Sequence, residues 1–353
     1  MKKDFSIGVT RDFLKPDGTS DFDTIGAPAF DNAGLHWEYL PTLTSTLTAA
    51  QVQNYDALLV LGAGVTAETV ANADRLAIIA RFGVGYDKVD VAACTENGVL
   101  LTIAPDGVRR PVATSIITFV LALSHQLLIK DRLTRGDGWA HKQDYMGMGL
   151  VGRTLGLVGM GNIGAEVFRL AQPFGMRHIA FDPYVSTADA DALNVELVGL
   201  DTLMQTADFV CVCCPLTAQT RGLINAHRIE LMKPTAYLIN TARGPIVDQG
   251  ALTDALRHRR IQGAGLDVFE EEPIAAAEPL LELDNVIVTP HSICWTDECF
   301  QRISQSACDS IARVAIGQLP SWIVNSAVVD SPKLHEKLNR LLQEARLQTA
   351  PTR

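Results

Sequence analysis

A glycine-rich spacing at residues 159–164 is the first feature of this chain that could do chemistry. The segment reads GMGNIG, a G-x-G-x-x-G pattern that follows the apolar run TLGLV and precedes the helix-like AEVFRLAQPFG. The next apolar run ends in Asp182, 23 positions after Gly159. Glycines alone recur in many turns without a ligand, but this context and spacing are typical of a turn that binds the pyrophosphate of a dinucleotide.

Each residue of this turn has an expected role. Gly159 permits the tight turn, Gly161 lets the pyrophosphate approach the backbone, and Gly164 lets the helix pack closely on the strand. Asn162 and Ile163 begin the helix, where free N–H groups and the positive end of the helix dipole favour phosphate.

Asp182 indicates which dinucleotide is bound. Its carboxylate can accept hydrogen bonds from the adenosine ribose hydroxyls and would repel a 2′-phosphate. The residues after it, PYVST, include no arginine or lysine that would favour that phosphate. We therefore expect NAD, rather than NADP, as the cofactor.

Three further polar residues each follow an apolar run: Arg243 in LINTARGPIVD, Glu272 in GLDVFEEEP and His291 in VIVTPHSICWT. Taken singly, each has an ordinary explanation: a surface ion pair, a solvated turn or a packed loop. The carboxyl ends of parallel strands share one edge of a sheet, where ligands bind. The three side chains together with the glycine turn therefore predict one site.

The elements that would position these residues form two alternating series. Residues 5–104 hold four apolar runs, at Phe5–Val9, Ala57–Leu61, Leu76–Phe82 and Val99–Ile103, separated by helical or turn-rich sequence. A helix is expected from Pro111 to about Lys130, with Pro111 in its first turn. Six more runs of strand length follow: TLGLVGM, HIAFD, DFVCVCC, AYLINTA, GAGLDVF and NVIVTP. Near-continuous apolar strands of this kind belong to parallel sheets covered on both faces.

The expected architecture is α/β, with two doubly wound parallel-sheet domains: a Rossmann NAD-binding domain inserted into a flavodoxin-like substrate domain. A helix at about Thr296–Gly317 follows the last run, so residues after 291 should rejoin the first half of the chain. We expect residues 1–108 and 292–330 to form the substrate domain, and 109–291 the NAD-binding domain. Residues 331–353 form a basic amphipathic helical tail that docks on the body or on a partner subunit.

Composition excludes several classes of protein. The chain has 353 residues and a net charge of −10, whereas a nucleic-acid binder needs a basic face. The most apolar stretch, residues 116–123, is far shorter than the roughly 20 residues of a membrane span, and MKKDFSIGVT lacks the apolar core of a signal peptide. Seven cysteines fit the reducing cytoplasm, and the C-x-x-C of Cys211 and Cys214 reads as a buried strand, so no metal site is expected.

The motifs in this order strongly resemble the D-isomer-specific 2-hydroxyacid dehydrogenase family, a group that includes phosphoglycerate dehydrogenases and hydroxypyruvate reductases. The resemblance covers roughly residues 55–325 and includes ARFGVGYDKVDVAACTENGVLL, GMGNIG, CCPLTAQTRGLIN and the three segments around Arg243, Glu272 and His291. It implies NAD-dependent interconversion of a D-2-hydroxy acid and its 2-keto acid. It also implies a homodimer with the helix from Pro111 at the interface.

The resemblance also implies roles for particular residues. Arg243 would bind the substrate carboxylate and carbonyl, His291 would be the general acid/base, and Glu272 its partner. A neighbouring carboxylate favours the imidazolium form, which donates a proton during keto-acid reduction. Asp267 would bind the nicotinamide carboxamide, and the backbone N–H groups of Val84 and Gly85 would hold the substrate carboxylate. The remaining positions expected around the cofactor are Cys214, Pro215, Thr241 and Ala242.

The substrate is left open by the sequence. Phosphoglycerate-type members usually carry an arginine in the loop where this chain reads LGAGVTAE. Arg109 and Arg110 could bind a second anionic group of the substrate or pair with surface acids, and Trp295 could line the pocket or pack in the core. A short-form D-3-phosphoglycerate dehydrogenase is the alternative enzyme. A non-catalytic NAD-sensing protein is the remote alternative, since it would not need Arg243, Glu272 and His291 together.

Overall fold

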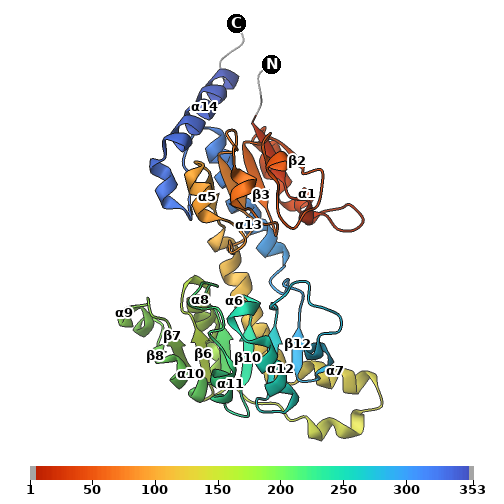
Figure 1. The fold of residues 1–353 in the computed structure, drawn as a ribbon. Coiled ribbons are helices and arrows are strands. Elements are labelled where there is room, and N and C mark those ends of the chain that lie inside the picture. Colours follow the sequence, from red (N-terminus) through yellow and green to blue (C-terminus); the bar gives the residue numbers. More distant parts are fainter. Residues whose placement is uncertain (1–4, 350–353) are drawn as a thin grey trace. The chain divides into compact units, whose positions relative to one another are not determined.

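In the computed structural model, which describes residues 5–349, the chain forms two compact units (Figure 1). Among the described residues, unit 1 comprises residues 5–108 with 296–349, and unit 2 comprises residues 109–295. Each unit holds one parallel sheet, which confirms the predicted α/β class with two doubly wound sheets. The division into a substrate domain and an inserted NAD-binding domain stays a prediction for the roles of the two units.

Unit 1 has a five-stranded sheet in the order β2-β1-β3-β4-β5. The strands are β1 (Ser6–Val9), β2 (His36–Tyr39), β3 (Ala57–Val60), β4 (Ile78–Arg81) and β5 (Leu100–Thr102). The helices that accompany them are α1 (Asp21–Ile25), α2 (Ala27–Asn32), α3 (Ala49–Val52), α4 (Ala67–Val70), α5 (Val91–Glu96), α13 (Asp297–Ala315) and α14 (Pro332–Thr349). Sequence analysis missed β2, because HWEY lies at the sheet edge and none of its residues is fully buried.

Unit 2 has a seven-stranded sheet in the order β12-β11-β10-β9-β6-β7-β8. Its strands are β6 (Thr154–Val158), β7 (Arg177–Phe181), β8 (Glu196–Leu197), β9 (Phe209–Val212), β10 (Tyr237–Asn240), β11 (Gly263–Leu266) and β12 (Val286–Val288). Its helices are α7 (Leu127–Arg135), α8 (Asn162–Ala171), α9 (Thr187–Asp191), α10 (Leu200–Thr206), α11 (Ala226–Glu230) and α12 (Gln249–Arg257), with most of α6 (Pro105–Ser124). Strands β6, β9, β10 and β11 are buried at every position, as their apolar runs require. The two-residue edge strand β8 was not predicted.

The single helix predicted from Pro111 to Lys130 is wrong at both ends. Helix α6 begins at Pro105, so Pro111 lies inside it, and a second helix, α7, follows it. The break has a physical cause in the returning chain. The Ser124 carbonyl accepts a hydrogen bond from the Met148 N–H at 2.7 Å, and Gln126 takes the left-handed conformation (φ 52°) between the two helices.

By length and apolar composition α6 would suit a bilayer span, and buried core helices also have these properties. Its Phe119 is 1% exposed and packs where a Cβ on Gly265 of β11 would lie 2.7 Å from the ring. This part of α6 is therefore a core element of unit 2.

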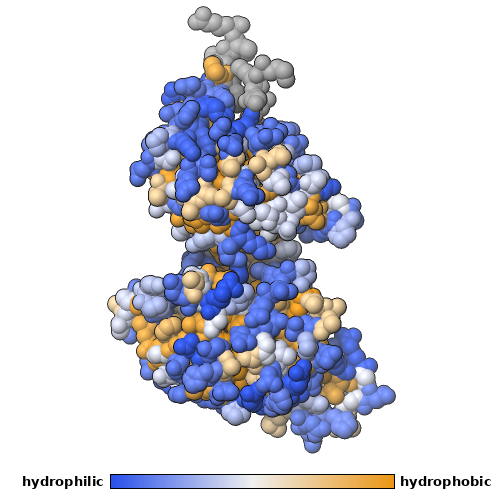
Figure 2. All heavy atoms as spheres, viewed as in Figure 1, coloured by the Kyte–Doolittle hydropathy of each residue, from blue (hydrophilic) through white to orange (hydrophobic). Residues whose placement is uncertain are grey.

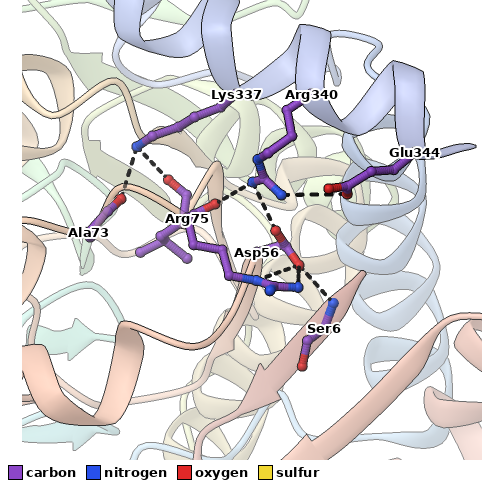
Figure 3. Close-up of polar contacts among 8 residues, drawn as sticks. Ser6, Asp56, Ala73, Arg75, Lys337, Arg340 and Glu344 are labelled. Atoms are coloured by element: carbon purple, nitrogen blue, oxygen red, sulfur yellow. Dashed lines mark hydrogen bonds and ion pairs between the residues drawn. The ribbon is translucent and has the colours of Figure 1, made fainter. Parts of the chain in front are cut away.

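The tail helix α14 docks on unit 1 through buried polar contacts (Figure 3). The Lys337 ammonium donates to the carbonyls of Ala73, Leu76 and Asn97 at 3.1, 2.7 and 2.8 Å. Ala73 and Leu76 lie in the segment that leads into β4, and Asn97 lies in the turn before β5. Lys337 of α14 therefore links the amino ends of two neighbouring strands. The apolar face predicted for the tail is buried as well, at Leu334, Leu338 and Leu341, while the outward face is mostly hydrophilic in Figure 2, apart from the exposed Leu347.

A second cation on α14 completes the attachment. Arg340 donates to Asp56 Oδ1 at 2.9 Å, and Arg75 pairs with Asp56 Oδ2 at 2.5 Å. Asp56 has no exposed surface, and its Oδ2 also accepts from the Ser6 N–H at 2.9 Å. A carboxylate buried this completely is stable because its oxygens are hydrogen-bonded and its charge is paired.

We predict that Lys337→Met destabilises the chain by about 2–4 kcal/mol, because three buried carbonyls lose their donor. Burial lowers the pKa of Lys337 to about 8, below the 10.5 of an unfolded lysine. The stability linked to this lowered pKa is present above about 10.5 and is lost as pH falls through 8. In urea unfolding at pH 7.5–9.5, wild type should therefore gain stability with pH relative to Lys337→Met. Parallel pH profiles would contradict the assignment.

Candidate functional site

The predicted phosphate turn lies at the topological switch point of the unit 2 sheet. Strand β6 has β7 on one side and β9 on the other, and such a reversal opens a crevice at the carboxyl ends of the strands. Gly159 follows β6 with φ at +101°, and Cys214 follows β9. A Cβ on Gly159 would lie 2.7 Å from the Cys214 backbone nitrogen, so only glycine fits this crossing.

The other two glycines of the turn differ in their surroundings. A Cβ on Gly164 would lie 2.5 Å from the Gly159 carbonyl oxygen, so this glycine lets α8 pack against the turn. A Cβ on Gly161 would meet no described atom within 4 Å. Helix α8 begins at Asn162, followed by Ile163, directly beside this open space. The turn thus has the room and the helix N-terminus that a pyrophosphate needs.

Asp182 follows β7 and braces the same turn. Its Oδ2 accepts from the Met160 N–H at 2.8 Å, and its Oδ1 accepts from the Tyr184 N–H at 2.9 Å. Across the switch point, burial raises the pKa of the Cys214 thiol to about 11, so this half-buried group is neutral at pH 7. The Pro215 carbonyl beside it accepts from the Thr220 hydroxyl at 2.6 Å.

Arg243 is held at the end of β10 by the side chain of Asn240, a residue that sequence analysis missed. Asn240 is buried; its Oδ1 accepts from the Ala242 N–H at 3.0 Å and its Nδ2 donates to the Arg243 carbonyl at 2.9 Å. Arg243 Nη1 donates to the Ala242 carbonyl at 2.7 Å. A polar residue at the end of an otherwise apolar strand was the available signal. Thr241 lies within this braced loop.

Asp267 anchors the loop that carries His291. Its Oδ1 accepts from the Thr289 hydroxyl at 2.6 Å and from the N–H groups of Ser292 and Ile293 at 2.9 and 3.2 Å. Burial raises the pKa of the Asp267 carboxyl, although these donors and the nearby His291 act in the opposite direction. The structure thus adds a positioning role to a residue predicted to contact nicotinamide.

His291 and Glu272 are brought into direct contact, 19 positions apart in the chain. His291 Nδ1 lies 2.7 Å from Glu272 Oε2, and Glu272 Oε1 accepts from the Phe269 N–H at 3.1 Å. Burial raises the pKa of Glu272, but the hydrogen bond and charge of His291, assisted by Arg243, outweigh it and lower the pKa overall. The His291 side chain is 43% exposed, and its Nε2 has no hydrogen-bond partner within residues 5–349.

The loops of Arg243 and Glu272 touch at Gly244. A Cβ on Gly244 would lie 1.9 Å from the Phe269 carbonyl carbon and oxygen, and 2.5 Å from the Glu270 nitrogen. No side chain can enter such a space without separating the two loops. Gly244 therefore sets how closely the guanidinium loop approaches the carboxylate that holds His291.

In unit 1, Val84 and Gly85 lie in the loop after β4, and both are half-buried. Neither backbone N–H finds an acceptor in the described part of the chain. Arg81, which sequence analysis missed, shapes this loop: its Nε donates to the Gly85 carbonyl at 2.6 Å and its Nη1 to the Val60 carbonyl at 2.8 Å. An arginine at the end of an apolar run was again the signal.

The remaining predicted residues differ in placement. Arg110 pairs with Glu166 at 2.7 Å, which matches the surface-pairing alternative for that residue. Trp295 is 52% exposed, so it is not a core aromatic within its unit. Arg109 lies at the start of unit 2, inside α6. Across residues 5–349, no group of three or more His, Cys, Asp or Glu side chains is placed to hold a metal ion.

Comparison with known proteins gives consistent results. Residues 117–292 match the sequence model described as the NAD binding domain of D-isomer specific 2-hydroxyacid dehydrogenase. A glyoxylate reductase of Korarchaeum cryptofilum is 38% identical over 283 residues, which are 79% of this chain and 85% of that protein. A D-3-phosphoglycerate dehydrogenase of Methanocaldococcus jannaschii is 38% identical over 295 residues, 83% of this chain but 56% of that protein. The chain thus spans little more than half the length of this relative.

Solved structures agree. The TT0316 protein of Thermus thermophilus has a TM-score of 0.78 at 32% identity, covering 91% of this chain and 100% of that one. A D-lactate dehydrogenase of Aquifex aeolicus, solved with NAD and lactic acid, has a TM-score of 0.75 at 28% identity, covering 86% and 93%.

We predict that Gly244→Ala lowers both stability and activity, because the added methyl must force the two loops apart. The free energy of unfolding should fall by about 1–3 kcal/mol, and kcat should fall by a larger factor than in a control variant whose added methyl meets no neighbour. Gly222→Ala is the matched control, since no described atom lies within 4 Å of its Cβ position, although its φ of +63° adds some strain. Thermal unfolding and initial rates measure both effects. Equal behaviour of the two variants would remove the constraint assigned to Gly244.

Proposed function

Because this chain belongs to the D-isomer-specific 2-hydroxyacid dehydrogenase family, we propose that it interconverts a D-2-hydroxy acid and its 2-keto acid with NAD. Membership makes it an oxidoreductase that acts on CH–OH groups and has a nicotinamide-dinucleotide domain. The observation that carries the finer proposal is the 2.7 Å contact of His291 Nδ1 with Glu272 Oε2, beside the Arg243 loop.

In this mechanism His291 is the acid/base group. With Nδ1 held by Glu272, Nε2 donates a proton to the carbonyl oxygen of the keto acid and takes it back in the reverse direction. The Glu272 carboxylate stabilises the imidazolium that is needed before donation. Proton transfer at this atom completes the reduction, for which the bound nicotinamide supplies the hydride.

Arg243 binds the substrate and polarises it. The guanidinium is planar and always charged, so it can hold a carboxylate oxygen and the adjacent carbonyl oxygen together. In unit 1, the N–H groups of Val84 and Gly85 have no acceptor in the described part of the chain, and in this proposal they bind a substrate carboxylate. Arg109 and Trp295 remain proposed substrate contacts.

The residues around the switch point fit a dinucleotide. The open space at Gly161 and the N-terminus of α8 suit the pyrophosphate, and Asp182 lies at the end of β7, where the ribose is expected. The nicotinamide side is assigned to Cys214, Pro215, Thr241, Ala242 and Asp267. The carboxylate of Asp182 is what favours NAD over NADP.

A second candidate is D-3-phosphoglycerate dehydrogenase activity of a short form. The 38% identity to the M. jannaschii protein of that name favours it. The two candidates share the chemistry of Arg243, Glu272 and His291 and differ in the charge of the substrate.

We further propose that this chain forms a homodimer and that it is located in the cytoplasm. The segment from α7 to Val151 exposes apolar side chains that a partner subunit would cover: Leu127, Leu128, Trp139, Met146 and Val151. The sequence holds seven cysteines in 353 residues, a usage that fits a reducing compartment better than a disulfide scaffold.

We predict that Arg243→Ala lowers kcat/KM for 2-keto acids by about 10² to 10³, because the developing charge on the carbonyl oxygen loses its cation. Loss of NADH absorbance with glyoxylate, hydroxypyruvate, pyruvate and 3-phosphohydroxypyruvate measures this. Arg177→Ala, which removes an exposed arginine paired with Glu196, is the control and should keep full activity. Unchanged kcat/KM in Arg243→Ala would reject the assigned role.

We also predict that Asp182→Ala lowers the preference for NADH over NADPH by at least about tenfold, since one charge repelling the 2′-phosphate is gone. Asp182→Asn keeps an oxygen that can accept from the Met160 N–H, so this variant removes the charge without removing that hydrogen bond. Both variants should shift the ratio of kcat/KM values for the two cofactors. A ratio equal to that of wild type in both would show that Asp182 does not face the ribose.

A further inference from the structure

The unit 1 sheet has its own topological switch point, between β1 and β3. Strand β2 lies on one side of β1, and β3, β4 and β5 lie on the other. The loops that follow β1 and β3 therefore border the crevice where an open parallel sheet binds its ligand. These loops are residues 10–14 and 61–66, and neither holds a residue assigned above to catalysis or to cofactor binding.

Asp12 joins these two loops. Its Oδ2 accepts from the Gly62 N–H at 2.7 Å, and its Oδ1 accepts from the Thr10 hydroxyl at 2.5 Å. Thr10 Oγ1 in turn accepts from the Leu61 N–H at 3.1 Å. The Gly62 N–H, which an anion at this edge could otherwise use, is thus already bound to a carboxylate.

The same contact restricts what can stand at position 62. A Cβ on Gly62 would lie 3.0 Å from Asp12 Oδ2. A side chain at this position would lie against the Asp12 carboxylate and would have to shift it by a few tenths of an ångström. The loop itself, LGAGVT, carries no charge.

The other charges near this edge have different positions. Lys15 is paired with Asp21 at 2.7 Å, and Arg81 directs two donors to the carbonyls of Gly85 and Val60. Arg11 precedes Asp12 in the same turn and is exposed. Asp12 is half-buried and both of its carboxylate oxygens are hydrogen-bonded, so it is a negative charge held in place at the switch point.

We propose that Asp12 is a specificity-determining residue that selects 2-keto acids with one negative charge and disfavours those with a second anionic group. This inference rests on the proposed function. Within unit 1, the Val84 and Gly85 loop accepts the first carboxylate, and a phosphate or second carboxylate on the far carbon meets the Asp12 charge. Neutral substituents at that position, such as hydrogen or hydroxymethyl, carry no charge for the Asp12 carboxylate to repel.

The test compares hydroxypyruvate with 3-phosphohydroxypyruvate, which differ by the phosphate. Wild type should have the higher kcat/KM for hydroxypyruvate. Asp12→Asn keeps an oxygen that accepts from the Gly62 N–H but removes the charge. It should raise relative use of the phosphorylated substrate by about five- to tenfold, mainly through its KM. Because the effect is electrostatic, the shift should shrink in 0.5 M KCl.

Two variants separate charge from loop geometry. Thr10→Val breaks the hydrogen bonds to Leu61 and Asp12 but keeps the carboxylate, so it should change kcat/KM for both substrates alike. Arg11→Gln removes the neighbouring exposed charge and should not raise use of the phosphorylated substrate.

Two kinds of result would overturn the proposal. One is an unchanged ratio in Asp12→Asn or the same ratio shift in Thr10→Val. The other is a wild-type preference for 3-phosphohydroxypyruvate. Absence of activity on every 2-keto acid would instead reject the proposed function itself, and the two failures are therefore distinguishable.

Discussion

Close approach of loops at the carboxyl edge of the unit 2 sheet is the constraint on which the candidate site depends. The Arg243 loop can lie against the Phe269 carbonyl only because residue 244 is glycine. That contact brings the guanidinium loop beside Glu272, and Glu272 holds the His291 ring. Parallel strands end side by side at about 4.8 Å spacing, so loops on neighbouring strands must share little room.

Buried polar groups keep these loops in place. Asn240 and Asp267 each lie at the end of an apolar strand. Their side chains form hydrogen bonds with backbone groups of the loops that carry Arg243 and His291. A buried polar group without partners would be destabilising, so each such residue has one arrangement that satisfies it. The orientation of Arg243 and His291 is therefore determined by residues that need not contact a substrate.

The two units use the same device for different charges. At the unit 2 switch point the space beside Gly161 and the start of α8 favour an anion. At the unit 1 switch point the Gly62 N–H is already bound by Asp12. Each doubly wound sheet thus fixes a carboxylate on a backbone N–H at its switch point, and the unit 2 sheet adds open space beside a helix N-terminus.

The apolar runs and the spacing of the glycine motif determined the strands and the phosphate turn from the sequence alone. The apolar runs at Thr154–Val158 and Tyr237–Asn240 predicted buried parallel strands, and the G-x-G-x-x-G spacing placed Gly159 and Asp182 around one turn, because both signals are local in the chain. Tertiary structure alone decided the rest. The end of α6 at Ser124 is set by the returning Met148, and the pairing of Asp12 with Gly62 joins residues 50 positions apart. Such contacts depend on how strands are ordered in a sheet, and local sequence does not encode that order.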